Sequence, residues 1–143
     1  METLQHPITV FWLCMLMHLI ADYTLQGCLA NLKQKSWWDQ QLRDLAHSAK
    51  DPKTPEEQQR IFNKYQHDYL AGLACHALMW SIMTCLPLLL ICSPRVFSDA
   101  VMINTVIHQA IDDLKANKLC INLWQDQLLH WIQVTVTVVL VMA

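Results

Sequence analysis

Glycine and charged residues are scarce in this sequence, and their scarcity argues against several classes of protein. The 143 residues include only two glycines, and charged residues make up 15% of the chain, against ~25% of an average soluble domain. This composition argues against a disordered, a collagenous or a disulfide-rich secreted chain. The six cysteines include no C-x-x-C pair, and we interpret them as small apolar residues. A chain of this length is expected to form a single domain, residues 1–143.

The few charges are unevenly placed and leave long stretches almost free of charge. Ile8–Ala30 contains one charged residue, Asp22, and Tyr69–Pro94 contains none. From Leu119 to the C-terminus the only charged residue is Asp126. A fourth stretch, at about 96–115, is shorter and more polar than these three. Since a bilayer-crossing helix needs ~20 mostly apolar residues, the sequence predicts an all-α integral membrane bundle of four transmembrane helices. We place these spans at about 7–27, 69–92, 96–115 and 122–143.

The positive charges predict how this bundle is oriented. Nine of the ten Lys and Arg residues lie in the loop 31–68 or at Lys115 and Lys118, between spans one and two or spans three and four. Basic residues favour the cytoplasmic side, so we expect a bacterial inner-membrane protein with a cytoplasmic loop and both termini in the periplasm. Residues 1–7 lack the basic residues of a signal peptide, so the first span is expected to stay as an anchor. The basic residues alternate with Asp and Glu, which argues against nucleic acid as a partner.

The loop 31–68 is expected to form two short amphipathic helices broken at Asp51-Pro52. In the first helix, Trp38, Leu42 and Leu45 share one face at helical spacing. The second begins with the capping box Thr54-Pro55-Glu56-Glu57. Its apolar stripe comprises Ile61, Phe62, Tyr65 and Tyr69. The pattern favours an interfacial collar, and the alternative is a lid or a partner-docking surface over the polar site.

Histidine and aspartate recur one helical turn apart inside the predicted spans. Three pairs are each four residues apart: His18/Asp22, His108/Asp112 and Asp126/His130. This spacing puts both side chains of a pair on one face of a helix. With the predicted topology, the three pairs and His76 all lie ~5–12 Å inside the cytoplasmic boundary. Ionisable residues inside a membrane are costly and are usually functional.

The chemistry of these seven groups suits a metal site. Imidazole nitrogens and carboxylate oxygens bind Zn²⁺, with Mn²⁺ or Fe²⁺ as alternatives, so we expect one or two divalent ions, zinc being favoured. The expected ligands are His18, Asp22, His76, His108, Asp112, Asp126 and His130. Two ions would suit hydrolysis of a phosphate ester, with Asp126 as a general base and with Lys115 and Gln26 holding an anionic headgroup. The other interpretations of the cluster are a metal-free proton path and plain interhelical pairing.

The order of these motifs resembles a known family of small membrane proteins. Four segments carry the resemblance: His18-Leu-Ile-Ala-Asp22-Tyr-Thr-Leu25-Gln26, His76, Ile107-His108-x3-Asp112-x2-Lys115 and Asp126-Gln127-x2-His130. Together they resemble the bacterial and phage family known as domain of unknown function 3307. The resemblance implies a shared pattern of Asp22, Leu25, Gln26, His108, Asp112, Lys115, Asp126, Gln127 and His130. It implies no activity, and the pattern is only loosely similar to that of membrane-bound metal-dependent hydrolases.

Three functions stay open at this point. The leading hypothesis is a metal-dependent hydrolase acting on a membrane-associated substrate. The second is a carrier or channel for protons or divalent ions, for which Asn104 and Asp99 offer scattered polar positions beyond the cluster. The third is a non-enzymatic membrane partner, such as a phage factor, that associates with another membrane protein or with a second copy of the chain.

Overall fold

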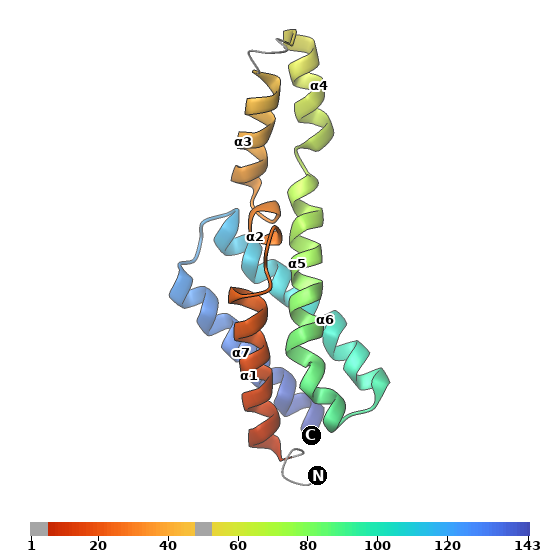
Figure 1. The fold of residues 1–143 in the computed structure, drawn as a ribbon. Coiled ribbons are helices and arrows are strands. Elements are labelled where there is room, and N and C mark those ends of the chain that lie inside the picture. Colours follow the sequence, from red (N-terminus) through yellow and green to blue (C-terminus); the bar gives the residue numbers. More distant parts are fainter. Residues whose placement is uncertain (1–5, 48–52) are drawn as a thin grey trace.

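The computed structural model describes residues 6–47 and 53–143, and this part of the chain is all-helical. Helices account for 83% of it and it contains no strand, which confirms the all-α prediction. Its four long helices are α1 (Pro7–Tyr23), α5 (Asp68–Cys85), α6 (Pro94–Ala116) and α7 (Leu123–Met142). Each packs against two others in the ring order α1, α5, α6, α7, so the four helices enclose a common interior (Figure 1).

The long helices begin and end where the sequence supplies the appropriate residues. Ser93 accepts a hydrogen bond from the N–H of Val96, the third residue of α6, and Asn122 accepts one from the N–H of Gln125, the third residue of α7, as N-cap residues do. Pro94 occupies the first position of α6, where a backbone N–H is not needed. α5 gives way to the 3₁₀ turn η2 (Leu86–Leu90), because Pro87 cannot donate the hydrogen bond that would continue the helix.

The segment between α1 and α5 folds as a short helix followed by a helical hairpin. α2 (Leu29–Leu32) follows a turn at Gly27, whose φ of +49° is a conformation that glycine adopts without strain. α3 (Lys35–Ala46) and α4 (Pro55–Tyr65) then form an antiparallel hairpin that extends past the end of the four-helix bundle (Figure 1). The break predicted at Asp51-Pro52 lies outside the described residues.

The hairpin matches the prediction of two amphipathic helices in the loop. Thr54 forms the expected capping box: its Oγ1 accepts from the Glu57 N–H at 3.3 Å, and Glu57 Oε2 accepts from the Thr54 N–H at 2.8 Å. The apolar face of α3 differs from the prediction at one residue. Leu42 is buried, whereas Leu45, expected on the same face, is 50% exposed.

A test of length and apolar composition finds one membrane-span candidate within residues 6–47 and 53–143. It is the run Pro55–Leu90, and Pro7–Tyr23 is apolar but shorter. α6 and α7 fall short of the test because each carries several Asp, Asn, Gln or His residues within its length. The four-span architecture is therefore not confirmed by this test and stays a prediction.

The interior of the bundle is apolar at one end and polar at the other. The apolar core includes Val10, Cys14, Leu88, Val134 and Val138. The predicted site residues come late in α1 and α6, midway along α5 and early in α7. Because consecutive long helices run in opposite directions (Figure 1), these positions all fall at the end of the bundle that faces the hairpin.

α2 lies close against α5 at Gly72, which has no side chain to separate the two helices. A Cβ built on Gly72 would overlap the backbone carbonyl of Leu32, whose carbon would be 2.6 Å away. Trp38 Nε1–H donates to the same carbonyl oxygen at 2.8 Å. At the end of α6, Asn117 Oδ1 accepts from the Lys35 N–H at 2.8 Å. These contacts hold the residues after α2 over the polar end of the bundle.

Gly72→Ala should lower the midpoint of thermal unfolding. The added methyl group forces α2 away from α5 at a cost of ~1–3 kcal/mol, although alanine would otherwise favour the helix by ~1 kcal/mol. Gly27→Asn is the control, because nothing lies within 4 Å of a Cβ at Gly27 and asparagine tolerates a left-handed backbone. An unchanged or raised midpoint in Gly72→Ala would contradict the close packing of α2 on α5.

Candidate metal centre

The seven ionisable groups predicted to form one site lie together at the polar end of the bundle, and we refer to them as the His/Asp cluster. α1 supplies His18 and Asp22, α5 supplies His76, α6 supplies His108 and Asp112, and α7 supplies Asp126 and His130. All seven residues are buried, and the most exposed, Asp22, retains 9% of its accessible surface. Helical spacing turns each His/Asp pair inward, and the packing of the four helices brings the pairs into contact.

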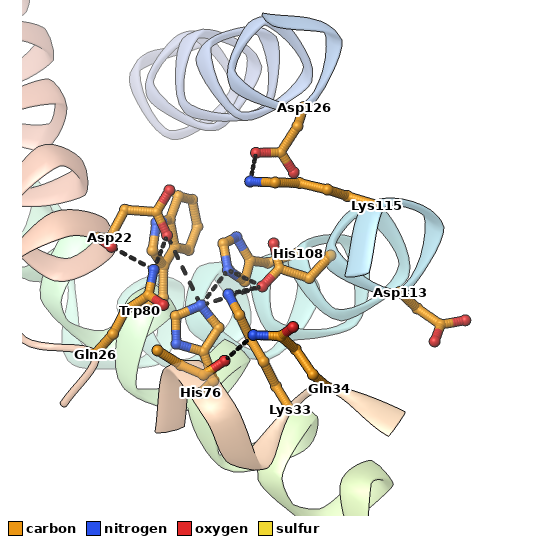
Figure 2. Close-up of polar contacts among 12 residues, drawn as sticks. Asp22, Gln26, Lys33, Gln34, His76, Trp80, His108, Asp113, Lys115 and Asp126 are labelled. Atoms are coloured by element: carbon orange, nitrogen blue, oxygen red, sulfur yellow. Dashed lines mark hydrogen bonds and ion pairs between the residues drawn. The ribbon is translucent and has the colours of Figure 1, made fainter. Parts of the chain in front are cut away.

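The carboxylate of Asp112 is the centre of the His/Asp cluster. Its Oδ2 lies 3.2 Å from His76 Nε2 and 3.7 Å from His108 Nε2, and its Oδ1 lies 3.4 Å from His130 Nε2. Lys33 Nζ donates to Asp112 Oδ2 at 2.6 Å. Figure 2 shows the side chains of His76, His108 and Lys33 converging on one point. One carboxylate therefore contacts side chains from α5, α6, α7 and the end of α2.

Three atoms of the cluster form a triangle of the size that a metal ion requires. Its corners are His76 Nε2, His108 Nε2 and Asp112 Oδ2, and its sides are 3.2, 3.2 and 3.7 Å. A tetrahedral ion with bonds of ~2.1 Å holds its ligand atoms ~3.4 Å apart. Two overlapping groups of side chains in the described part of the chain, each sharing two residues with this triangle, could also hold an ion, with ligand atoms within 4.8 Å of one another. They are Asp22, His76 and His108, and His108, Asp112 and His130.

Unpaired ligand-type atoms extend this site toward α7. His130 Nε2 and Asp126 Oδ1 lie 3.5 Å apart, and neither has a hydrogen-bond partner among the described residues. Buried nitrogen and oxygen atoms are nearly always paired in stable proteins. Because His130 Nε2 also faces Asp112 Oδ1 at 3.4 Å, these atoms fit a second cation position. The residues present thus suit one or two divalent ions of the kind that imidazole and carboxylate bind.

His18 lies in the cluster, but both of its ring nitrogens are in use. Trp80 Nε1–H donates to His18 Nδ1 at 3.0 Å. Because indole is only a donor, the neutral imidazole carries its proton on Nε2, which lies 3.3 Å from Gln127 Oε1. The Gln127 amide is then turned so that its Nε2 donates to Asp22 Oδ2 at 3.0 Å and to Asp126 Oδ2 at 3.1 Å. His18, expected from the sequence to be a ligand, acts here as a positioning residue and belongs to neither metal-sized group.

The three residues predicted to have catalytic roles lie at the edge of the cluster. Asp126 Oδ2 accepts from Lys115 Nζ at 2.7 Å. Gln26 Nε2 donates to the backbone oxygen of Asp22 and, at 3.2 Å, to Asp22 Oδ1. Figure 2 shows Lys115 turned toward Asp126 and Gln26 turned toward Asp22. In this structure each of the two side chains holds one carboxylate in place.

A cavity of about 370 Å³ borders the cluster on the side of α2. Its polar lining comprises Gln26, Lys33, Gln34, Asp112 and Lys115. The side chain of Lys33 is 11% exposed and that of Lys115 is 35% exposed, so two ammonium groups border the cavity. The cluster is therefore open to a ligand from one side, where each of the two ammonium groups is paired with a carboxylate of the cluster.

A neighbouring ion pair lies outside the lining of this cavity. Lys118 Nζ is 3.0 Å from Asp113 Oδ2, and Figure 2 shows Asp113 pointing away from the cluster. The hydrogen bond that Lys118 donates to Asp113 raises the pKa of Lys118 above its ordinary value. Lys118 therefore offers a matched control for the lysines of the cavity.

Sequence reasoning missed Trp80 and Lys33, and it named Gln127 only as part of a family pattern. Trp80 follows His76 by four residues, so its place on the same helix face was a readable signal. Lys33 gave no such signal. Its approach to the cluster depends on tertiary contacts such as the hydrogen bond from Asn117 Nδ2 to the Lys33 backbone oxygen, at 3.3 Å.

Comparison with known proteins adds no relative. No protein-family model, no curated protein and no solved structure matches the chain. The resemblance to domain of unknown function 3307 is therefore neither confirmed nor refuted and stays a prediction. What the site can do has to be inferred from its geometry.

Trp80→Phe should disconnect His18 from its hydrogen-bond donor. The phenyl ring keeps much of the apolar packing but leaves His18 Nδ1 buried without a partner, at a cost of ~1–3 kcal/mol. We expect a lower unfolding midpoint and altered ¹⁵N chemical shifts of the His18 ring, measured by NMR on protein labelled at histidine. Trp124→Phe is the control, because Trp124 is 84% exposed. Identical His18 shifts in wild type and Trp80→Phe would refute the relay from Trp80 to Gln127.

Proposed function

We propose that this chain is a bacterial inner-membrane protein whose His/Asp cluster binds one or two divalent ions and hydrolyses a membrane-associated anionic substrate, a phosphate ester. In this proposal four helices cross the bilayer, the cluster lies near the cytoplasmic face and both termini face the periplasm. The observation that carries it is the triangle of His76, His108 and Asp112 beside a cavity lined by Lys33 and Lys115. Association with a second copy or with another membrane protein stays a prediction.

The distribution of polarity supports the bilayer location. Large apolar side chains on the outside of the four long helices are each 42% to 66% exposed; they include Trp12, Leu16, Leu78, Ile82, Met102, Val106, Leu128, Trp131, Ile132 and Val136. The buried positions include, beside the apolar core, four His and three Asp residues together with Asn104 and Gln133. Soluble proteins rarely expose this much apolar surface, whereas a helical bundle in lipid turns its polar side chains inward.

The donor set suits zinc first, with manganese or iron as alternatives. In the proposed site His76, His108 and Asp112 would hold one ion, with Asp22, whose Oδ1 is 3.8 Å from His76 Nε2, as a further candidate ligand. Asp112 and His130 would hold a second ion. A bound divalent ion polarises a phosphoryl oxygen and lowers the pKa of a bound water.

Asp126 is the proposed proton acceptor. Its Oδ2 is held by Lys115 Nζ at 2.7 Å and by Gln127 Nε2 at 3.1 Å. Its Oδ1 lies 3.5 Å from His130 Nε2 and accepts no hydrogen bond in the part of the chain that the structure describes. A carboxylate held in this way can accept a proton at Oδ1 from an adjacent water. Lys115 and Gln26 both line the cavity, which supports the expectation that they orient an anionic headgroup.

Elemental analysis of the detergent-extracted protein should find at least one divalent ion per chain. His108→Ala and Asp112→Ala each remove a corner of the ligand triangle. Loss of a residue that hydrogen-bonds to a metal ligand lowers metal affinity by ~10–100-fold. Loss of a ligand itself should lower the affinity of these two variants by more than that. His67→Ala is the control, because His67 is exposed and lies outside the cluster.

The possible outcomes separate the parts of the proposal. Metal-free wild-type protein, purified without chelators, would refute the metal centre. Recovery of the protein in the soluble fraction without detergent would refute the bilayer location. Metal-loaded protein that hydrolyses no phosphate ester would leave the metal centre standing and refute the hydrolase.

A second polar layer supports the alternative of an ion or proton path. Asn104 Nδ2 donates to Thr137 Oγ1 at 2.9 Å, and Gln133 Nε2 donates to Asn104 Oδ1 at 2.8 Å. Asn104 is 2% exposed and Gln133 is 6% exposed, so this network lies inside the bundle, one helical turn from the cluster. A further cavity of about 200 Å³ is bordered by Asp99, Asn104 and Thr137. Polar side chains therefore continue from the cluster toward the apolar end.

Proton flux in liposomes distinguishes this path from the hydrolase. The hydrolase predicts that wild-type protein gives no more flux than protein-free liposomes, measured with a pH-sensitive dye trapped inside. Flux that is lost in Asn104→Leu but kept in Thr135→Val would favour the path instead. Thr135 suits the control because it is exposed and its hydroxyl donates to the backbone oxygen of Trp131 within its own helix.

A further inference from the structure

We propose that Lys33 occupies a cation position on Asp112 in the metal-free protein, and that metal binding releases it into the cavity, where it binds a phosphate group. This inference rests on the proposed metal centre and adds to it an order of binding, metal before anion. It also names the chemical class of the ligand, a phosphate group.

The contact between Lys33 and Asp112 coincides with the metal position. Lys33 Nζ is 2.6 Å from Asp112 Oδ2, the oxygen that also lies 3.2 Å from His76 Nε2 and 3.7 Å from His108 Nε2. An ion held by those three atoms would bond to Asp112 Oδ2 and repel an ammonium group on the same oxygen, since like charges at short range in a buried site repel strongly. The ion and Lys33 therefore compete for one carboxylate oxygen.

The backbone around Lys33 is held while its side chain has room to turn. Asn117 Nδ2 donates to the Lys33 backbone oxygen at 3.3 Å, and Asn117 Oδ1 accepts from the Lys35 N–H at 2.8 Å. The Lys33 side chain borders the cavity of about 370 Å³, as do Lys115, Gln26 and Gln34. A lysine has a flexible four-carbon stem, so its ammonium group can leave Asp112 and stay at the cavity wall.

The charge of the cluster favours an anion more strongly once metal has bound. Three buried aspartates carry three negative charges, and the ammonium groups of Lys33 and Lys115 balance two of them. Each divalent ion that binds adds two positive charges to this balance. Unbalanced charge in a buried site is costly. The loaded cluster therefore attracts an anion more strongly than the metal-free cluster.

A phosphate group is the anion that fits this lining. It carries a charge of about −1.5 to −2 and three strong acceptor oxygens. These match the two ammonium groups and the second amide hydrogen of Gln34, whose first is donated to the Ala30 backbone oxygen. A cavity of this volume lies in the range of ~300–1,000 Å³ typical of small-molecule sites. Leu119, also in the lining, is 81% exposed. The phosphate group could thus come from a soluble ester or from a lipid headgroup, two sources that the experiment separates.

The test measures binding of inorganic phosphate by calorimetry to the full chain in detergent, metal-free and loaded with Mn²⁺. We expect Mn²⁺ to lower the phosphate Kd by at least ~tenfold, and phosphate to tighten Mn²⁺ binding by the same factor, because such coupling is reciprocal. Lys33→Gln should lose most of this gain in phosphate affinity. It should bind Mn²⁺ at least as tightly as wild type, because no ammonium group competes for Asp112. Lys118→Gln should change neither affinity, because Lys118 pairs with Asp113 outside the cavity lining.

Failure of this inference is distinguishable from failure of the proposed function. Equal phosphate affinity with and without Mn²⁺, or in Lys33→Gln and wild type, overturns the switch and leaves the metal centre intact. Weaker Mn²⁺ binding in Lys33→Gln also overturns it, since Lys33 would then support the metal rather than compete with it. If wild-type protein binds no Mn²⁺ and no Zn²⁺, the proposed metal centre itself is refuted.

A competition arm identifies the source of the phosphate group. If phosphatidic acid, presented in phosphatidylcholine vesicles, displaces inorganic phosphate from the metal-loaded protein, the site binds a lipid headgroup. Displacement by glycerol phosphate alone assigns it to a soluble ester. If neither competitor displaces inorganic phosphate, the inference that the cavity takes a phosphate group attached to a larger molecule is overturned.

Discussion

The polar end of this bundle depends on one buried carboxylate, that of Asp112. The residue is 3% exposed, and its oxygens contact His76, His108, His130 and Lys33 from three helices and the segment after α2. A buried charge without such partners strongly destabilises a fold, so the four long helices can pack only in a register that brings these side chains to Asp112. The same register holds the ligand atoms at metal-binding separations. Stability and the candidate site therefore rest on the same contacts.

The other two carboxylates of the cluster each face one histidine, and a chain of hydrogen bonds also holds them. Gln127 joins Asp22 to Asp126, His18 orients Gln127, and Trp80 fixes the proton of His18 on Nε2. Metal ligands in proteins are commonly held by such outer partners, which set their orientation before the ion arrives. The arrangement explains why polar residues outside the candidate ligand set are buried beside those that could hold an ion.

Most of the helical structure could be predicted from the sequence, because helices and caps depend on neighbours a few residues away. The capping box at Thr54 and the amphipathic helices of the hairpin follow from such short-range patterns. The four membrane spans stay a prediction for a physical reason. α6 and α7 carry their polar side chains on the buried face, which lowers their mean hydropathy although their outer faces are apolar. A measure averaged around the helix cannot separate these two faces.

The sequence by itself determined the all-α class and the candidate residues of the site, because the i, i+4 spacing of His and Asp puts each pair on one helix face. Only the tertiary structure decided what each residue contacts. It placed Asp112 at the centre, paired His18 Nδ1 with Trp80, and brought Lys33 from the loop onto Asp112. The physical reason is that helical periodicity determines which way a side chain faces. Hydrogen bonds and ion pairs across an interior join residues far apart in the chain, and helix packing alone selects those partners.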